Sequence, residues 1–552
     1  MFGIRNRLRP MIRVETLVLL VVAWLVATAN FTWWAAVGQG RSWSQPANWW
    51  FLVCCFTALA ALHYMVLAPF AHRWVVRPLL TLVVVVSAAA AWYMRTYAVM
   101  LDPTMVQNVL RTDAHEAGEL LNWDMVAWVL AWSALPLAGI WLVRLQSVKP
   151  LRAVLVRAGT VLAACAIAVC AFLAISRDLT SFMRNEREAR YLITPGNYLY
   201  GLAVNSMHRV EDRHVVRETV GADAHFMSVS NVAGPRVLVL VIGETARAAN
   251  FSLLGYARET NPELAGADIT AFSNVTSCGT STEVSVPCMF SPYGRAHYDE
   301  RRIRNSEGLL DVLVRAGYAV KWLDNQSGCK GVCKGAGIEF EKTCKAGECH
   351  DEILVRRLAE ELSQVEGNTV FVLHMIGNHG PAYFQRYPAE FRRFLPDCET
   401  AELRDCTREQ VVNSYDNAIL YTDHVLAGII GTLKRAPRRL DSSMIYVSDH
   451  GESLGEHGLY LHGIPYAIAP ELQTHVPMLV WVSRQMSATG DVDVTCLRGK
   501  SREALSHDNL FHSVLGLMDV KTAAYLPARD IFDGCRGGIA RSYAQTTADK
   551  VR

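Results

Sequence analysis

The first third of the chain alternates long apolar stretches with short polar loops. Five stretches are each about 20 residues or longer, the length that an α-helix needs to cross roughly 30 Å of hydrocarbon. They cover residues 14–37, 49–70, 75–97, 123–145 and 153–175. Helices in the core of a soluble domain are usually shorter and do not occur in such a series. The pattern therefore predicts a transmembrane domain with five helices over residues 1–176.

The charges of the loops predict how these spans are oriented. Arginine and lysine gather before the first span, in the loop between the second and third spans, and in the loop between the fourth and fifth. The loop over residues 100–122 is net acidic instead. Because basic loops stay in the cytoplasm, everything after the fifth span is expected outside it. The stretch ending at Ala27-Thr28-Ala29 could also be a cleaved signal peptide, which would leave the remaining topology unchanged.

Beyond the spans, the pattern changes twice. Residues 177–234 are polar and mixed, with a helical stretch over 181–190. They are interpreted as a bridge along the membrane surface, although an ordinary linker fits nearly as well. From residue 235 to 552, apolar runs of strand length alternate with amphipathic helical segments. This alternation predicts an exported α/β domain with a mostly parallel central sheet. The clearest runs are 237–242, 369–376, 443–447 and 478–482.

Composition excludes one class of partner. Lys and Arg number 54, and Asp and Glu number 52, so the charges nearly cancel. A nucleic-acid-binding protein normally carries a clear basic excess, so nucleic acid is not expected as a partner of this chain.

The cysteines are consistent with export. Cys54, Cys55, Cys165 and Cys170 fall within predicted spans, and the other ten of the 14 lie in the exported part. An even number of exported cysteines predicts disulfides, although sequence alone does not fix the connectivity. A structural zinc site is the less favoured alternative, since the cysteines are scattered over different loops. The close pairs are Cys278/Cys288, Cys329/Cys333, Cys344/Cys349 and Cys398/Cys406, and Cys496 and Cys535 remain.

Metal-binding side chains follow three of the apolar runs. Glu244 follows the first run, His379 the second, and Asp449 and His450 the third. Open α/β sheets bind ligands beyond the carboxyl ends of their strands. One Asp-His pair alone would more often belong to a turn, but all three runs together predict a metal site. Mixed oxygen and nitrogen ligands favour zinc, with manganese as the alternative.

A nucleophile is expected in the hydroxyl-rich segment 273–290. Thr280 precedes a plausible helix start, where backbone N–H groups favour a phosphate. A metal-bound hydroxyl also loses its proton more easily. The alternative role of Thr280 is simply to cap the helix.

Longer motifs then identify a family. The chain contains VIGETARAANFSLLGYARETNP, TSCGTSTEVSVPCMFS, DNQSGCKGVC, GNHGPAYFQRYP and SDHGESLGEHGLYLHGIPYAIAP. Together with the five spans, they resemble the lipid A phosphoethanolamine transferases. These include the mobile colistin-resistance enzymes and belong to the alkaline-phosphatase superfamily. The resemblance implies an inner-membrane protein with a periplasmic catalytic domain of alkaline-phosphatase/sulfatase type.

The same resemblance implies a reaction. A zinc-bound threonine would take phosphoethanolamine from phosphatidylethanolamine and pass it to a phosphate of lipid A. This would lower the negative charge of the cell surface and give resistance to cationic polymyxins. At least one zinc ion is expected, a second is an option, and the enzyme is expected to be a monomer.

Site residues carry over by position. The zinc ligands would be Glu244, Thr280, Asp449 and His450, with Thr280 as the nucleophile. His379 and His462 would be further active-site histidines that hold the phosphate, protonate the leaving group or bind a second zinc. Lys330 would contact substrate, as would Gln326, where the family often has asparagine. Asn108, Thr112 and Glu116 share one helical face and would lie near the lipid headgroup, although a solvated polar face is the alternative.

Rival functions explain less of the sequence. A glycerophosphate transferase of the lipoteichoic-acid-synthase type has a similar plan, but the cysteine pairs and DNQSGCKGVC favour phosphoethanolamine transfer. The acceptor could also be a core sugar or another glycan. A sulfatase needs a Cys- or Ser-x-Pro-x-Arg motif, which CMFSPYGR does not provide. A membrane sensor or scaffold would not need metal ligands converging on a threonine.

Overall fold

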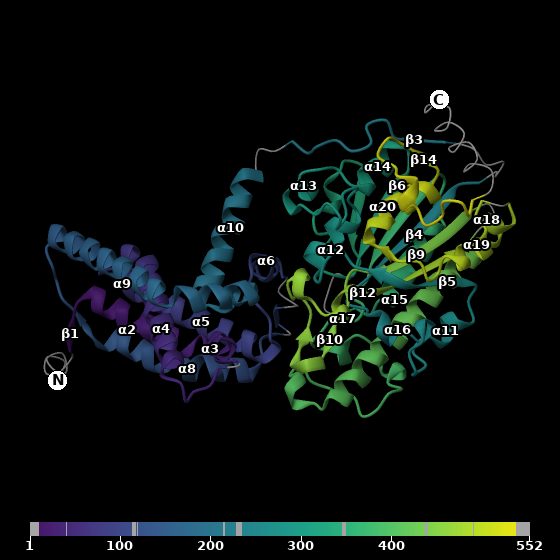
Figure 1. Cartoon of the computed structure of the whole chain (residues 1–552). Helices are drawn as coiled ribbons and strands as arrows, with labels where there is room; N and C mark the ends of the chain where they lie inside the picture. The colour runs from purple at the N-terminus through teal and green to yellow at the C-terminus, as the bar shows by residue number, and fades with distance from the viewer. Residues whose placement is uncertain are drawn as a thin grey trace, which may run out of the picture. The chain divides into compact units, whose positions relative to one another are not determined.

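The chain folds into two compact units, Met1–Met207 and His208–Arg552, which are called the helical unit and the α/β unit below (Figure 1). The computed structural model describes residues 10–39, 41–112, 117–118, 120–212, 216–227, 234–344, 349–436, 440–489 and 491–536. The boundary between the units falls within the segment 177–234 that the sequence assigns to a bridge. Each unit has hydrophobic cores of its own.

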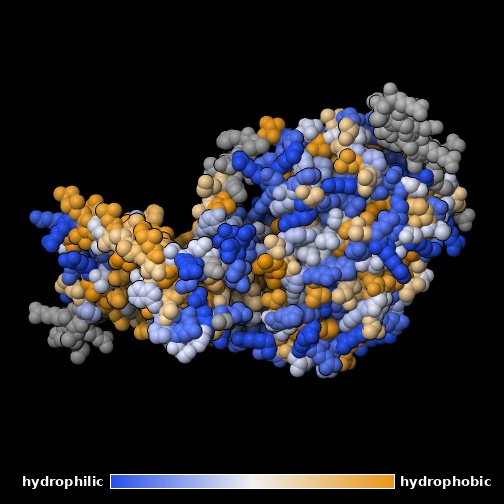
Figure 2. All heavy atoms as spheres, viewed as in Figure 1, coloured by the Kyte–Doolittle hydropathy of each residue, from blue (hydrophilic) through white to orange (hydrophobic). Residues whose placement is uncertain are grey.

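Within the described residues of the helical unit, four helices are long and apolar enough to cross a membrane. A bent pair makes a fifth span if it is counted as one. Figure 2 shows apolar residues over the surface of α9 and its neighbours, as expected for helices that face lipid. The main helices are α2 (Val14–Thr28), α3 (Phe31–Gly38), α4 (Pro46–Leu67), α5 (Val76–Tyr97), α8 (Trp123–Leu142) and α9 (Pro150–Asn185).

The first predicted span is broken at Asn30. Helices α2 and α3 meet there at an angle of 55°. The buried Asn30 amide nitrogen donates to the carbonyls of Leu25 (3.0 Å) and Thr194 (2.8 Å). Its amide oxygen accepts the backbone N–H of Thr194 at 2.7 Å. The side chain thus supplies hydrogen bonds where the helix is interrupted, which an apolar residue could not do.

The last span is longer than the sequence indicates. Helix α9 continues to Asn185, so it takes in the first half of the helical stretch predicted over 181–190. A short 3₁₀ helix (Arg187–Leu192) and then α10 (Gly196–Asp212) follow.

Among the described residues, the α/β unit is built on an eight-stranded sheet. Only β12 runs antiparallel to its neighbours β5 and β9, so the sheet is mostly parallel as predicted. The strands, in their order across the sheet, are β13 (Leu505–Ser506), β5 (Ile269–Thr276), β12 (His475–Val482), β9 (Asp441–Ser448), β4 (Arg236–Gly243), β8 (Thr369–His374), β6 (Ala319–Asp324) and β7 (Ile338–Lys342).

Helices cover both faces of this sheet. Alternate side chains of β4 enter opposite cores, because successive residues of a strand point to opposite faces. On one face the core includes residues of α14 (Leu309–Arg315) and α20 (Leu510–Leu517). On the other face it includes α15 (Glu352–Leu362) and α16 (Arg408–Arg435). Burial on both faces explains why the central strands are continuous apolar runs.

Disulfides hold the loops of the α/β unit. The four close pairs that the spacing suggests all form, and the two remaining exported cysteines pair with each other. Because a sulfur in a disulfide is not a thiolate and cannot act as a metal ligand, the structural zinc alternative is wrong for these cysteines. The bonds join Cys278 with Cys288, Cys329 with Cys333, Cys344 with Cys349, Cys398 with Cys406, and Cys496 with Cys535.

Each disulfide closes a loop next to a regular element. Cys278–Cys288 encloses the start of α12 (Thr282–Met289). Cys406 immediately precedes Thr407, the residue that caps α16, so its bond closes the loop that leads into that helix. The carbonyl of Cys349 accepts the amide of Asn325 at 2.9 Å, which ties the second cysteine of its loop to the end of β6. Such cross-links favour the fold chiefly by restricting the unfolded chain.

Cys349 and Cys406 are less buried than their partners. Both are half-buried, whereas Cys344 and Cys398 are buried. Neither Cys349 nor Cys406 belongs to the group of potential metal ligands found among the described residues. The sequence predicts both residues as disulfide partners, and the structure confirms that role.

A buried charged cluster lies where β4 and β9 begin. Arg236 pairs with Asp519 at 2.7 Å and with Asp491 at 3.2 Å. Asp441, its register partner on β9, is 1% exposed, and neither carboxylate oxygen has a hydrogen-bond partner in the described part of the chain. Burial raises the pKa of Asp441 to about 6, although Arg236 opposes the shift.

This gives a stability prediction for Asp441→Asn. The raised pKa means that the folded protein loses stability as the Asp441 carboxyl ionises between about pH 4 and pH 6, and the whole cost remains above pH 6. The amide removes that cost, on the order of 2 kcal/mol. Thermal unfolding of the full chain in detergent should show the variant more stable than wild type at pH 7.5 and equal to it at pH 4. Asp268→Asn, at a side chain 75% exposed, is the control. A variant equally destabilised at both pH values would contradict the assignment.

Candidate active site

Three buried side chains meet where two neighbouring strands end. Glu244 follows β4, and Asp449 and His450 follow β9, whose last residues are register partners of β4. One ligand atom from each lies within 4.8 Å of the others, and all three residues are 0% exposed. The parallel pairing of β4 with β9 therefore brings together residues that are some 200 positions apart in sequence.

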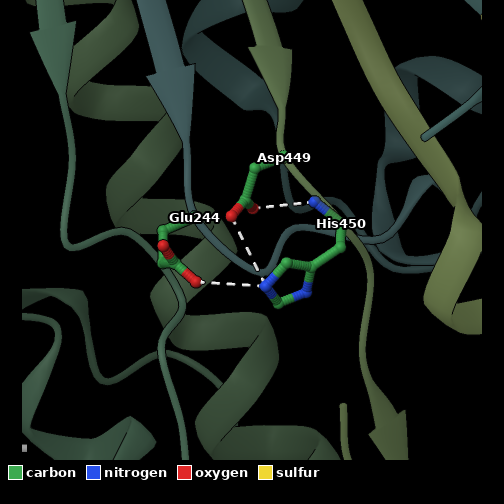
Figure 3. A group of neighbouring side chains, drawn as sticks. All are labelled: Glu244, Asp449 and His450. Carbon is green, nitrogen blue, oxygen red and sulfur yellow. Dashed lines mark hydrogen bonds and ion pairs between the residues drawn. The ribbon is translucent and has the colours of Figure 1, made fainter. Parts of the chain in front are cut away.

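Both carboxylates face one imidazole nitrogen (Figure 3). Nε2 of His450 lies 3.4 Å from Glu244 Oε1 and 3.4 Å from Asp449 Oδ2. The other ring nitrogen, Nδ1, donates to the carbonyl of Gly451 at 2.9 Å. That bond fixes the ring so that Nε2 is the atom presented to the cluster. Asp449 Oδ1 in turn accepts the backbone N–H groups of Thr245 (3.1 Å) and His450 (2.7 Å).

The electrostatics of the cluster favour a positive charge at its centre. Burial raises the pKa of Asp449, and the neighbouring Glu244 raises it further. Burial acts on Glu244 in the same direction, but the hydrogen bond and charge of His450 hold the pKa of Glu244 below its usual range. Burial lowers the pKa of His450, yet the two carboxylates outweigh it and raise that pKa to about 10.

The donor set fits a divalent metal ion. Asp449 Oδ2 is buried without a hydrogen-bond partner among the described residues, although it lies beside His450. Two carboxylates and one imidazole are ligands that zinc accepts readily. The cluster thus combines an acceptor in need of a partner with an environment that favours a cation.

Thr282 brings its hydroxyl to this cluster. Its Oγ1 lies 3.0 and 3.1 Å from the two oxygens of Glu244 and 3.4 Å from Nε2 of His450. Thr282 is the first residue of α12 and is 7% exposed. A hydroxyl at this position meets the free N–H groups of a helix N-terminus, which favour phosphate.

The geometry corrects the sequence-based choice of Thr280. Its Oγ1 donates to the carbonyl of Ile464 at 2.7 Å, and its own carbonyl accepts the N–H of Gly463 at 2.8 Å. Thr280 therefore ties the loop that carries His462 to the loop that precedes α12. The sequence shows hydroxyls at 280, 281 and 282, and the helix begins one residue later than the interpretation assumed.

The two further histidines lie beside the cluster. The ring centroid of His462 is 4.3 Å from that of His450 and 5.8 Å from that of His379. Nδ1 of His462 is 3.4 Å from Oε2 of the buried Glu452. Sequence reasoning missed Glu452, although it lies within the quoted motif that begins SDHGE.

The DNQSGCKGVC loop carries two predicted substrate contacts, Gln326 and Lys330, and Gln326 contacts the cluster. The buried amide of Gln326 donates to Glu244 Oε2 at 3.1 Å. The ammonium of Lys330 bonds to the hydroxyl of Ser327 and, at 3.4 Å, to its carbonyl. The Cys329–Cys333 disulfide closes the backbone around Lys330.

The predicted headgroup residues belong to the helical unit. Asn108 lies on α6 (Pro103–Arg111), and Thr112 follows its last residue. The hydroxyl of Thr112 donates to the carbonyl of Asn108 at 2.8 Å. Glu116 lies outside the described residues. A role for these residues at the metal cluster stays a prediction.

Comparison with known proteins connects both units to one activity. A family model described as phosphoethanolamine transferase EptA/EptB matches residues 59–209, and a sulfatase model matches residues 236–520. The chain is 40% identical over 474 residues to phosphoethanolamine transferase EptA of Escherichia coli K12, covering 84% of this chain and 86% of the relative. It is 30% identical over 447 residues to Kdo(2)-lipid A phosphoethanolamine 7''-transferase of Salmonella typhimurium, covering 76% and 77%.

A solved structure matches the whole architecture. The integral membrane lipooligosaccharide phosphoethanolamine transferase A of Neisseria meningitidis aligns with a TM-score of 0.89 and 35% identity. The alignment covers 96% of this chain and 99% of that one.

The ligand set gives a prediction for Glu244→Gln. The amide keeps the shape of the side chain but removes the negative charge, so divalent-metal affinity should fall by at least about 100-fold, beyond what outer-shell changes cost. Elemental analysis and chelator competition on the purified full chain measure this. Glu402→Gln, at a buried glutamate outside the cluster, should keep its metal. Full metal content in Glu244→Gln would remove Glu244 from the ligand set.

Proposed function

Since the chain belongs to the phosphoethanolamine transferase family, we propose that it transfers phosphoethanolamine from phosphatidylethanolamine to a phosphate of lipid A. The observation that carries the proposal is the Thr282 hydroxyl, held on Glu244 and His450 at the start of a helix. This arrangement provides a nucleophile, a metal site and donors for a phosphate at one point. The relatives identify the group transferred, and the site supplies the chemistry.

The metal in this proposal is zinc, held by Glu244, Thr282, Asp449 and His450. When bound, it supplies Lewis acidity that lowers the pKa of the threonine hydroxyl and stabilises charge on the phosphoryl group. Gln326 would hold Glu244 in its ligating orientation through the hydrogen bond between them. His379 and His462 lie where a second zinc or the phosphate oxygens could be held.

The first step forms a covalent intermediate. Oγ1 of Thr282 attacks the phosphorus of phosphatidylethanolamine and passes its proton to Glu244, which already accepts that hydroxyl. The bond from phosphorus to the glycerol oxygen breaks, and diacylglycerol leaves with a proton from His462 or His379. The N–H groups at the start of α12 hold the phosphate oxygens during the transfer.

The second step releases the group to the acceptor. An oxygen of a lipid A phosphate attacks the phosphothreonine, a new phosphorus–oxygen bond forms, and the bond to Thr282 breaks. The threonine oxygen regains its proton from Glu244, and the histidine that protonated diacylglycerol takes up the proton of the acceptor phosphate, so the site returns to its starting state. Splitting the reaction lets diacylglycerol leave before the second lipid arrives, so two whole lipids need not occupy the site at the same time.

Location and consequence follow from the same proposal. The chain is a membrane protein that would lie in the inner membrane of a bacterium. Its α/β unit, which follows the fifth span in the sequence, would lie in the periplasm. Asn108, Thr112, Glu116 and Lys330 would contact the lipid headgroups. Each added ethanolammonium offsets negative charge on lipid A, which would weaken binding of cationic polymyxins. One chain carries every proposed site residue, so we expect a monomer to suffice.

A second acceptor has support from the names of two relatives. The Salmonella typhimurium transferase is named for position 7'' of Kdo(2)-lipid A, which is a sugar site rather than a lipid A phosphate. The identity to that protein is 30%, against 40% to EptA of Escherichia coli. The lipid A phosphate is therefore the proposed acceptor, and the sugar is the alternative that product analysis must separate.

The covalent step predicts an adduct on Thr282. Purified full chain incubated with phosphatidylethanolamine alone should gain one phosphoethanolamine on the peptide that contains Thr282, by intact-mass and peptide mass spectrometry. Thr282→Val should form neither adduct nor product, because the attacking oxygen is absent. Thr280→Val, two residues away, keeps the nucleophile and should form the adduct at a reduced rate. Adduct formation by Thr282→Val would overturn the scheme.

The proposed acceptor predicts a change in lipid A itself. Cells that express the chain should yield lipid A heavier by one phosphoethanolamine, with fragmentation placing the group on a phosphate. Cells that express Thr282→Val should yield unmodified lipid A. Modification confined to the Kdo sugar would replace the proposed acceptor with the alternative.

A further inference from the structure

A third histidine joins the two segments that build the site. His507 lies just after the edge strand β13, is 1% exposed, and has both ring nitrogens engaged. Its Nδ1 accepts the backbone N–H of Cys278 at 3.0 Å. Its Nε2 donates to the carbonyl of Ser448 at 2.9 Å. One imidazole therefore spans the gap between the loop that leads into α12 and the end of β9.

These contacts specify one form of the ring. A nitrogen that accepts an amide proton carries no hydrogen, so the single proton of the neutral ring sits on Nε2, where the Ser448 carbonyl needs it. Burial lowers the pKa of His507 to about 4, so the ring is neutral at neutral pH. Nδ1 is therefore a hydrogen-bond acceptor and Nε2 is a donor, and the two roles cannot be exchanged.

The anchored backbone atoms lie close to functional residues. Ser448 immediately precedes Asp449 and His450, and Cys278 begins the disulfide-closed turn that contains Thr282. The residues on either side of His507 also contact the segments around α12. Ser506 is the register partner of Thr276, and Asp508 accepts the N–H groups of Arg295 and Ala296. His507 is therefore carried on a segment that is itself fixed to the loop that follows α12.

We infer that His507 is a positioning residue that sets the distance between the Thr282 nucleophile and the Asp449–His450 ligand pair. The inference rests on the proposed function and goes beyond it, because His507 touches no proposed ligand or substrate group. Its Nδ1 contact fixes the nucleophile segment, and its Nε2 contact fixes the ligand segment. Losing the contact with Cys278 should therefore slow adduct formation on Thr282 and leave zinc affinity unchanged. Losing the contact with Ser448 should lower zinc affinity and leave the rate unchanged.

Two substitutions separate the contacts. His507→Asn places an amide oxygen near the position of Nδ1, so it retains an acceptor for Cys278 and loses the donor to Ser448. His507→Gln reaches the position of Nε2 with an amide N–H, so it retains the donor to Ser448 and loses the acceptor for Cys278. His512→Asn is the matched control. It changes a fully buried histidine whose Nδ1 also accepts a backbone N–H, from Leu526, away from the cluster.

The experiment uses the full chain in detergent and three measurements. Chelator competition gives zinc affinity, rapid-quench mass spectrometry at saturating zinc gives the rate of adduct formation on Thr282, and thermal unfolding gives stability. We expect His507→Asn to lose about tenfold or more in zinc affinity with an adduct rate within threefold of wild type. We expect His507→Gln to show the reverse. His512→Asn should lower only the unfolding temperature.

Other outcomes overturn the inference. If the His507 variants lose only stability, as the His512 variant does, or if both lose affinity and rate equally, His507 does not divide the two tasks. If neither variant folds, ¹⁵N labelling of cysteine and histidine in the wild-type chain gives a direct test. A coupling across the hydrogen bond between a cysteine amide and a histidine Nδ1 is expected, and its absence overturns the geometry. Wild-type protein without zinc or adduct would overturn the proposed function itself, and this inference with it.

Discussion

The structure depends on keeping two carboxylates buried side by side. Glu244 and Asp449 stand at the ends of adjacent parallel strands with no exposure to solvent. Two such charges repel each other strongly in a water-poor interior and persist only with positive charge and hydrogen-bond donors around them. His450 supplies the positive charge, and the amides of Thr245 and Gln326 supply donors. The arrangement that is costly for stability is the one that favours a metal ion and binds the Thr282 hydroxyl beside it.

That cost can be borne because the strands behind the site are rigid. β4 is buried on both faces, and it pairs with β9 along its whole length and with β8 over residues 237–242. The carboxylates cannot move apart unless these ladders separate, which would expose two hydrophobic cores. The loops beyond the strands are joined by local ties of different kinds, including the Cys278–Cys288 disulfide, the bonds of Thr280 to the Ile464 loop and the two bonds of His507. The packing of the central strands thus fixes Glu244, Asp449 and His450, and individual hydrogen bonds and a disulfide fix the loops around these three residues.

This division explains which features the sequence could predict. The runs over 237–242, 369–376 and 443–447 were recognisable as central strands because burial on both faces requires uninterrupted apolar residues. Glu244, Asp449 and His450 followed from their places after those runs. The reversed direction of β12 leaves no mark in its residues, which are as apolar as those of the parallel strand β4. The break at Asn30 depends on Thr194, 164 positions away, and the roles of Gln326 and His507 depend on partners 82 and 229 positions away. No local pattern encodes such contacts.

The choice between Thr280 and Thr282 shows how sharply function depends on where a helix begins. The three consecutive hydroxyl residues 280–282 are chemically similar, yet the turn into α12 points each in a different direction. Thr280 binds the loop that carries His462, and the carbonyl of Ser281 accepts the N–H groups of Val284 and Ser285 in the first turn. Only Thr282, the first helical residue, places its oxygen on Glu244 and His450. Moving the helix start by one residue would rotate another hydroxyl toward the cluster, since successive helical residues differ by about 100°. The disulfide and the His507 contact with Cys278 both act on this turn, so they act on which hydroxyl reaches Glu244 and His450.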